Sequence, residues 1–225
     1  KAVPMASAKL QGVQHNIKPD SKGAILWVAT TWPSYFVRMD HVISGLFGPE
    51  YFSRQAQFFS VASPEVSKLL EVRFPNLEYG WNGVKRLIDI YPSIKIYKGG
   101  DSMHSQLRNS RLCIHDYLGT TWLETLSTNF PTVVFWEPKS INILKSAQPY
   151  LDDLRRVGIL YDTPESAAKL VNEIYEDPIS WWSSPDIQKV REKFCHQFAR
   201  TSDEWLFQWK EELLKIAGSQ KSRNQ

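Results

Sequence analysis

A strand, a turn, a helix, a second turn and a second strand are predicted in immediate succession between residues 111 and 138. The short apolar run 112–115 is followed by a segment whose apolar residues Trp122, Leu123 and Leu126 recur at helical spacing. Residues 132–136 (Thr-Val-Val-Phe-Trp) are β-branched or aromatic, as in a strand buried on both faces of a parallel sheet. This unit favours an α/β fold.

The turn inside this unit contains Gly119, Thr120 and Thr121 at the predicted start of the helix. The first N–H groups of a helix have no partner within it, so a turn of this kind outlines an anion-binding site. A second interpretation is purely structural, because a threonine can cap the helix and Glu124 can complete a capping box. The motif alone leaves both interpretations open.

The rest of the chain alternates between the same two patterns. Strands are predicted at 25–29, 70–74, 94–97, 112–115, 132–136 and 158–161. Helices are predicted at 49–62, 64–70, 83–91, 102–108, 119–129, 141–157, 163–177, 186–199 and 202–216, with turns at Pro178, Trp181-Trp182 and Pro185. This alternation predicts a Rossmann-like, doubly wound parallel sheet with a helical C-terminal end.

Ligands of such sheets bind at the carboxyl ends of the strands, where the loops 30–38, 99–103 and 116–121 are expected to converge. A mononucleotide with a phosphate group fits such a crevice.

The first of these loops places Thr30, Thr31 and Ser34 after the first strand, with Arg38 beyond them to meet negative charge. The alternative is a plain loop with a surface arginine. Arg73 ends the second strand, and its expected partner is either a carboxylate of the protein or a ligand phosphate.

Charge and metal-ligand spacing exclude several classes of function. The 27 basic and 24 acidic residues give a net charge of +3, too small to indicate nucleic-acid binding. Cys113 and Cys195 have no metal-ligand spacing and suit reduced thiols in a cytosolic protein. His104 and His115 are expected to be structural, so no metal is predicted.

The chain has no apolar run near the roughly twenty residues that a membrane helix needs, and no signal-peptide pattern at its start. The expected location is the cytoplasm, free or peripheral to the inner face of the membrane. Residues 1–24 are predicted to be a linker or entry segment, 25–200 a nucleotide-binding Rossmann-like domain, and 201–225 a C-terminal helix and tail. For Trp205, Phe207 and Trp209, core packing is expected over a ligand platform, and exposure of some of them is the alternative if the last helix crosses to another domain.

The chain resembles the C-terminal, donor-binding half of GT-B glycosyltransferases. More closely, it resembles bacterial transferases found with surface-polysaccharide and nonulosonic-acid genes. The matching segments are residues 26–35, 72–74, 80–81, 110–124, 129–136, 158–160 and 181–182.

This resemblance implies roles for individual residues. Gly119, Thr121 and Glu124 match a Gly-x-Thr-x-x-Glu pattern in which the helix start, including Thr120, holds the donor phosphate and the glutamate accepts from ribose hydroxyls. Thr30, Thr31 and Ser34 would face the phosphates, and Ser102 and Met103 the base edge through their backbone. Arg38 and Arg73 are inferred from charge alone.

The resemblance also implies a sugar transfer, in polysaccharide biosynthesis, from a nucleotide sugar to a glycan or other hydroxyl acceptor. CMP-linked nonulosonic acids are the first candidate donors, and no cofactor is needed. Since a complete GT-B enzyme has an N-terminal acceptor domain that usually supplies the base, this partner is expected in the same or another chain, and no catalytic residue is named. Two alternatives stay open: a nucleotide-sugar 2-epimerase and a non-catalytic domain that binds nucleotide or protein.

Overall fold

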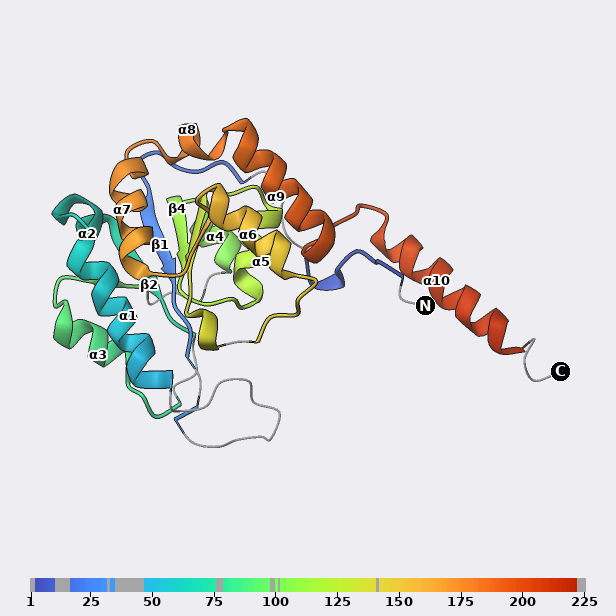
Figure 1. The fold of residues 1–225 in the computed structure, drawn as a ribbon, viewed down its shortest axis with the longest axis horizontal. Helices are drawn as coiled ribbons and strands as arrows, with labels where there is room; N and C mark the ends of the chain where they lie inside the picture. The colour runs from blue at the N-terminus through green and yellow to red at the C-terminus, as the bar shows by residue number, and fades with distance from the viewer. Residues whose placement is uncertain are drawn as a thin grey trace.

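Six parallel strands form a single sheet at the centre of the computed structural model (Figure 1). They are β1 (Ala24–Val28), β2 (Leu70–Arg73), β3 (Lys95–Ile96), β4 (Ser110–His115), β5 (Thr132–Phe135) and β6 (Leu160–Tyr161). Their order is β3-β2-β1-β4-β5-β6, which is the order of the Rossmann fold. The structure describes residues 3–10, 17–31, 33–34, 47–75, 79–97, 100, 102–140 and 142–221.

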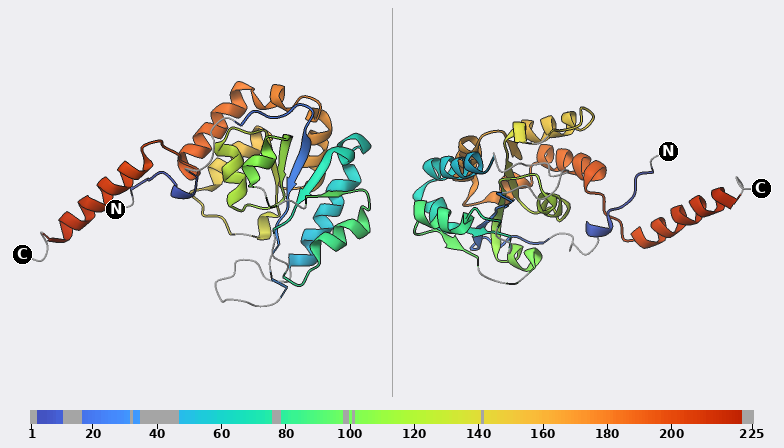
Figure 2. Two further views of the ribbon diagram at one scale, coloured as in Figure 1. Left: turned by 180° about the vertical axis from the view of Figure 1, so that it is seen from behind. Right: turned by 90° about the horizontal axis from the view of Figure 1, so that it is seen from below.

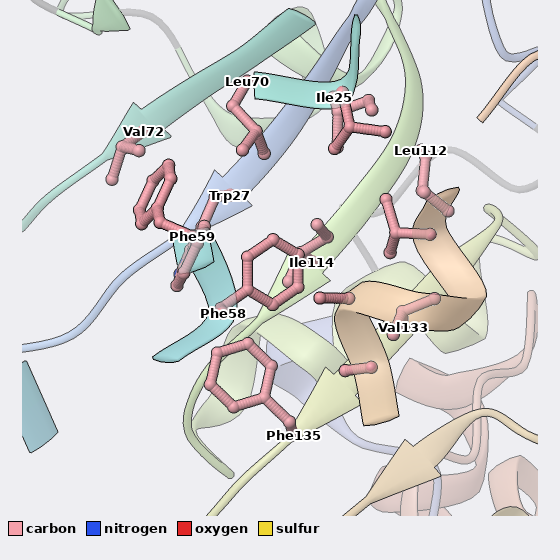
Figure 3. Close-up of a cluster of buried hydrophobic side chains, with 14 of the residues drawn as sticks. Ile25, Trp27, Phe58, Phe59, Leu70, Val72, Leu112, Ile114, Val133 and Phe135 are labelled. Carbon is pink, nitrogen blue, oxygen red and sulfur yellow. The ribbon is translucent and has the colours of Figure 1, made fainter. Parts of the chain in front are cut away.

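The central strands are apolar on both faces because helices cover both. Trp27 of β1 lies in register with Val72 of β2 and Ile114 of β4. Figure 3 shows these side chains with Phe58 and Phe59 packed over them. The Trp27 ring centroid lies 4.8 Å from that of Phe58. The prediction of a doubly wound parallel sheet is therefore confirmed.

Helices are divided between the two faces of the sheet. One face packs against α1 (Gly48–Val61), α2 (Pro64–Leu69), α3 (Gly83–Ile90) and α7 (Pro164–Ile174). The other packs against α4 (Met103–Leu107), α5 (Thr120–Ser127), α6 (Gln148–Arg156), α8 (Pro178–Trp182) and α9 (Pro185–Phe198). Short 3₁₀ turns lie at Ala8–Leu10 and Pro138–Ser140.

Two element predictions were wrong. The helix expected at 141–157 begins only at Gln148, and Pro149 lies in its first turn. Proline has no N–H to donate and clashes with the carbonyl one turn earlier, so it suits the beginning of a helix rather than its middle. The turn expected at Pro178 is instead the start of α8, which the Asp177 side chain caps by accepting from the Ser180 amide at 3.1 Å.

The last helix, α10 (Trp205–Lys221), projects away from the rest of the fold in every view (Figures 1 and 2). Phe207 is 62% exposed, so it lies outside the core, in agreement with the exposed alternative for this helix. The described N-terminal residues lie beside the end of α9, where the Ser7 amide donates to the Arg200 carbonyl at 2.9 Å. In the described part of the chain, no helix is both long enough and apolar enough to cross a membrane.

Candidate functional site

A cavity opens at the carboxyl edge of the sheet, beside the ends of β1, β2 and β4. Its volume is about 300 Å³. It is lined by Val28, Ala29, Thr30, Arg73, Phe74, Pro75, Tyr117, Gly119, Thr120 and Thr121. The strand order changes direction between β1 and β4, and open α/β sheets bind their ligands at this switch point. We call this space the switch-point cavity.

The start of α5 forms one wall of the switch-point cavity. Gly119 is the N-cap residue, with extended backbone angles and no side-chain hydrogen bond to cap the helix. Thr120 and Thr121 are the first two helical residues, so their N–H groups have no partner inside the helix. These amides and the positive end of the helix dipole give the wall the character of an anion site.

The same geometry decides against the capping-box interpretation. A capping box pairs the N-cap side chain with the third helical residue, which here is Trp122. Gly119 has no side chain to contribute, and Glu124 lies two residues too far along the helix. The two threonines are therefore inside α5 and do not cap it.

A buried histidine lies behind this wall. The Nδ1 atom of His115 lies 3.5 Å from the Thr121 hydroxyl, and its Nε2 atom lies 3.1 Å from the Thr125 hydroxyl. The Thr125 hydroxyl donates to the Trp122 carbonyl, so it accepts from Nε2–H and leaves Nδ1 as the acceptor facing Thr121. Burial lowers the pKa of His115 to about 3, so the imidazole is neutral at pH 7.

Arg73 contributes positive charge from the opposite side of the switch-point cavity. Its guanidinium donates to the Gln106 side-chain oxygen at 2.9 Å and lies 5.5 Å from the centre of the Tyr97 ring. This hydrogen bond to the uncharged Gln106 amide holds the guanidinium in place. The sequence predicted that Arg73 meets either a protein carboxylate or a ligand phosphate. The structure shows a third kind of partner, the side-chain amide of Gln106, and it places Arg73 in the wall of the cavity.

A buried carboxylate, Asp116, joins the end of β4 to the residues around β1. Its Oδ2 atom accepts from Trp27 Nε1 at 2.9 Å, from the Tyr51 hydroxyl at 2.7 Å and from Gln55 Nε2 at 2.9 Å. The Tyr51 hydroxyl also accepts from the Thr30 amide at 2.9 Å. Burial raises the pKa of Asp116 to about 6 despite these hydrogen bonds.

Sequence analysis did not select Asp116 or Tyr51. The position of Asp116 directly after an apolar strand was a usable signal, because that is where switch-point residues lie. No sequence signal pointed to Tyr51, which lies 65 positions away on α1.

The structure brings five of the predicted site residues together in the switch-point cavity. Thr30, Arg73, Gly119, Thr120 and Thr121 line the cavity. Thr31, Ser34, Ser102, Met103 and Glu124 are not among its lining residues, and Arg38 lies outside the described residues.

Three of the residues outside the lining have clear structural surroundings. Ser34 is exposed, and its amide donates to the Tyr79 carbonyl at 3.0 Å. Ser102 caps α4 by accepting from the Ser105 amide at 3.2 Å. The Met103 side chain is buried beside Leu26. The predicted contact of residues 102 and 103 with a base involves their backbone, and it stays a prediction.

An apolar groove adjoins the switch-point cavity and shares Tyr117, Gly119 and Thr120 with it. The groove has a volume of about 530 Å³, and Trp122 and Phe194 contribute to its wall. Among the described residues, no three His, Cys, Asp or Glu side chains gather closely enough to hold a metal ion.

Comparison with known proteins gives one family. The model of the LIC12162 family transferases matches residues 1–213, which is most of the 225-residue chain. A search of curated proteins found no match to the chain.

Proposed function

The chain belongs to the LIC12162 transferase family, and from this premise we propose that it binds the donor of a glycosyl transfer in the switch-point cavity. The predicted enzyme class is thereby confirmed at the level of a transferase. The proposed reaction moves a sugar from a nucleotide donor to a hydroxyl of a glycan or other acceptor. The observation that carries this proposal is the uncapped start of α5 facing a cavity that also contains Arg73.

The chemistry of the cavity suits a departing phosphate. In the proposed transfer, the bond between the anomeric carbon of the sugar and a phosphate oxygen breaks, and the phosphate leaves with the bonding electrons. The free amides at Thr120 and Thr121 and the Arg73 guanidinium are donors that stabilise such negative charge as it develops. The acceptor oxygen forms the new bond, and its proton goes to a base outside this set of residues.

The size and position of the cavity also favour a nucleotide. Its volume of about 300 Å³ is at the lower end of the range for ligand pockets, which is about 300–1,000 Å³. The strand order places it where mononucleotides bind in doubly wound sheets. Among donors, a CMP-linked nonulosonic acid is the first candidate, on the resemblance given above, and UDP- and dTDP-linked sugars follow.

Calorimetric titration of the purified chain with CMP, UDP, GDP and ADP tests this proposal. We expect saturable binding of at least one nucleotide, with CMP the first candidate. Inorganic phosphate serves as a control for binding that needs the anion alone. Absence of binding by all four nucleotides at millimolar concentration contradicts the proposed function.

A further inference from the structure

The backbone of β1 changes hydrogen-bonding partner where it reaches the switch-point cavity. The Ala29 amide still donates to the Arg73 carbonyl of β2 at 2.9 Å. One residue later, the Thr30 amide donates to the Tyr51 hydroxyl at 2.9 Å. A side chain of α1 therefore takes over from the sheet in fixing Thr30, the second residue beyond β1, which is also a residue of the cavity wall.

The Tyr51 hydroxyl has one proton to donate, and its surroundings decide where that proton points. Asp116 Oδ2 lies at 2.7 Å, whereas the competing acceptor, the Thr30 carbonyl, lies at 3.3 Å. An ionised carboxylate can only accept hydrogen bonds, so it fixes the hydroxyl as donor toward Asp116. The oxygen lone pairs of Tyr51 are then left to accept from the Thr30 amide at 2.9 Å and from Gln55 Nε2 at 2.8 Å.

Two further donors fix the carboxylate itself. Trp27 Nε1 and Gln55 Nε2 each donate to Oδ2 at 2.9 Å, and Asp116 is only 5% exposed. Buried hydrogen bonds of this kind rigidify the groups that they join. The chain of contacts from Asp116 through Tyr51 to Thr30 therefore links the end of β4 to the end of β1 beside the cavity.

We propose that Asp116 is a positioning residue for donor binding, which orients the Tyr51 hydroxyl so that it holds Thr30 in the wall of the switch-point cavity. This inference rests on the proposed function, because it assigns the network to the same binding site. The network acts on the part of the cavity wall that follows β1, whereas the α5 amides lie in the part that follows β4. It fixes the width of the space that receives the nucleotide and does not itself contact the reacting atoms.

A pair of variants separates this role from general support of the fold. Tyr51→Phe removes the hydroxyl that accepts from Thr30. Gln55→Met, the matched control, removes the amide that donates to both Asp116 and the Tyr51 hydroxyl, and it keeps the hydrogen bond between Tyr51 and the Thr30 amide. Gln55 and Tyr51 lie on the same turn of α1 and are both buried, so the two changes disturb the packing at one place.

The first measurement is the affinity of the full chain for CMP by calorimetry. We expect Tyr51→Phe to weaken binding roughly three- to tenfold, because Thr30 loses the hydrogen bond that holds it in the cavity wall. Gln55→Met should weaken binding less than Tyr51→Phe does, because Thr30 keeps its partner. Equal weakening by both variants, at equal loss of melting temperature, would overturn the proposal in favour of a purely structural network.

The second measurement needs no ligand. Hydrogen exchange of the Thr30 amide should become at least about tenfold faster in Tyr51→Phe, because its acceptor is gone, and should stay unchanged in Gln55→Met. Unchanged exchange in Tyr51→Phe overturns the proposal even if nucleotides bind. The two measurements also separate failure of this inference from failure of the proposed function. If the wild type binds no nucleotide but the Thr30 amide exchanges faster in Tyr51→Phe, the proposed function is wrong and the contact from Asp116 through Tyr51 to Thr30 is still supported.

Discussion

The imidazole of His115 lies against the hydroxyl of Thr121, with 3.5 Å between Nδ1 and Oγ1, so a buried neutral ring backs the helix start that lines the switch-point cavity. The next residue, Asp116, contacts a second lining residue, Thr30, through Tyr51. Two consecutive residues, His115 and Asp116, thus support two parts of the cavity wall.

The first prediction concerns the pH dependence of stability. Burial lowers the pKa of His115 from 6.5 to about 3, so the unfolded chain binds a proton that the folded chain does not. The stability contributed by neutral His115 is therefore fully present above pH 6.5 and is lost as the pH falls toward 3. The free energy of unfolding in urea should be measured for the wild type and for His115→Gln. The difference, wild type minus variant, should decrease steadily as the pH falls from about 6.5 to 4. A difference that does not vary with pH contradicts this assignment.

The second prediction separates helix stability from anion binding at Gly119. Aspartate at this N-cap position should stabilise α5 by about 1 kcal/mol, because its side chain can accept from the free amides. The same carboxylate would occupy the proposed phosphate position and repel the ligand. Gly119→Asp should therefore raise or preserve the melting temperature and abolish CMP binding.

Gly119→Asn is the matched control, because it caps the helix without adding charge. A Cβ atom at this position meets only the Tyr117 ring, at 3.5 Å, so both substitutions fit sterically. The anion-site interpretation is wrong if Gly119→Asp binds CMP as well as Gly119→Asn does.

The third prediction concerns the charge of Arg73. Arg73→Gln should weaken CMP binding roughly tenfold or more, because a hydrogen bond to a charged group contributes more than a neutral one. The control is Lys85→Gln, which removes a positive charge from α3. The Lys85 side chain is 74% exposed. Lys85→Gln should leave the affinity unchanged. Similar affinities for the two variants would mean that Arg73 does not contact the ligand.

The fourth prediction concerns Glu124, to which the resemblance assigns a ribose hydroxyl. Glu124→Ala should change the melting temperature little, because Glu124 is not part of a capping box. The wild type should bind CMP more tightly than dCMP, and Glu124→Ala should lose this preference by weakening CMP alone. Equal weakening of both nucleotides contradicts contact with the 2′-hydroxyl and leaves the residue outside the ribose site.

The sheet and the start of α5 were predictable because they depend on local patterns. The apolar runs at residues 25–29 and 132–136 expose apolar side chains on both faces of a strand, so they are stable only in a sheet that is covered on both faces. Both runs form strands of that sheet. Gly119 marked the beginning of a helix between two such strands. The parallel order then places all the strand ends at one edge.

The contacts that shape the cavity were not predictable, because they join residues far apart in the chain. Tyr51 meets Asp116 across 65 positions, and Arg73 meets Gln106 across 33. The Met103 side chain packs around Leu26, whereas the sequence assigned this residue only a contact through its backbone. The local periodicity of the sequence does not specify which distant side chains contact one another.

The central claim is that the amides of Thr120 and Thr121 bind the phosphate of a nucleotide donor. Amide chemical shifts of the ¹⁵N-labelled chain during titration with CMP test it most directly. The account predicts that Thr120 and Thr121 show the largest saturable shifts, and that these are absent in Gly119→Asp. Saturable binding of CMP that leaves both resonances in place, with the shifts clustered elsewhere on the protein, would contradict it.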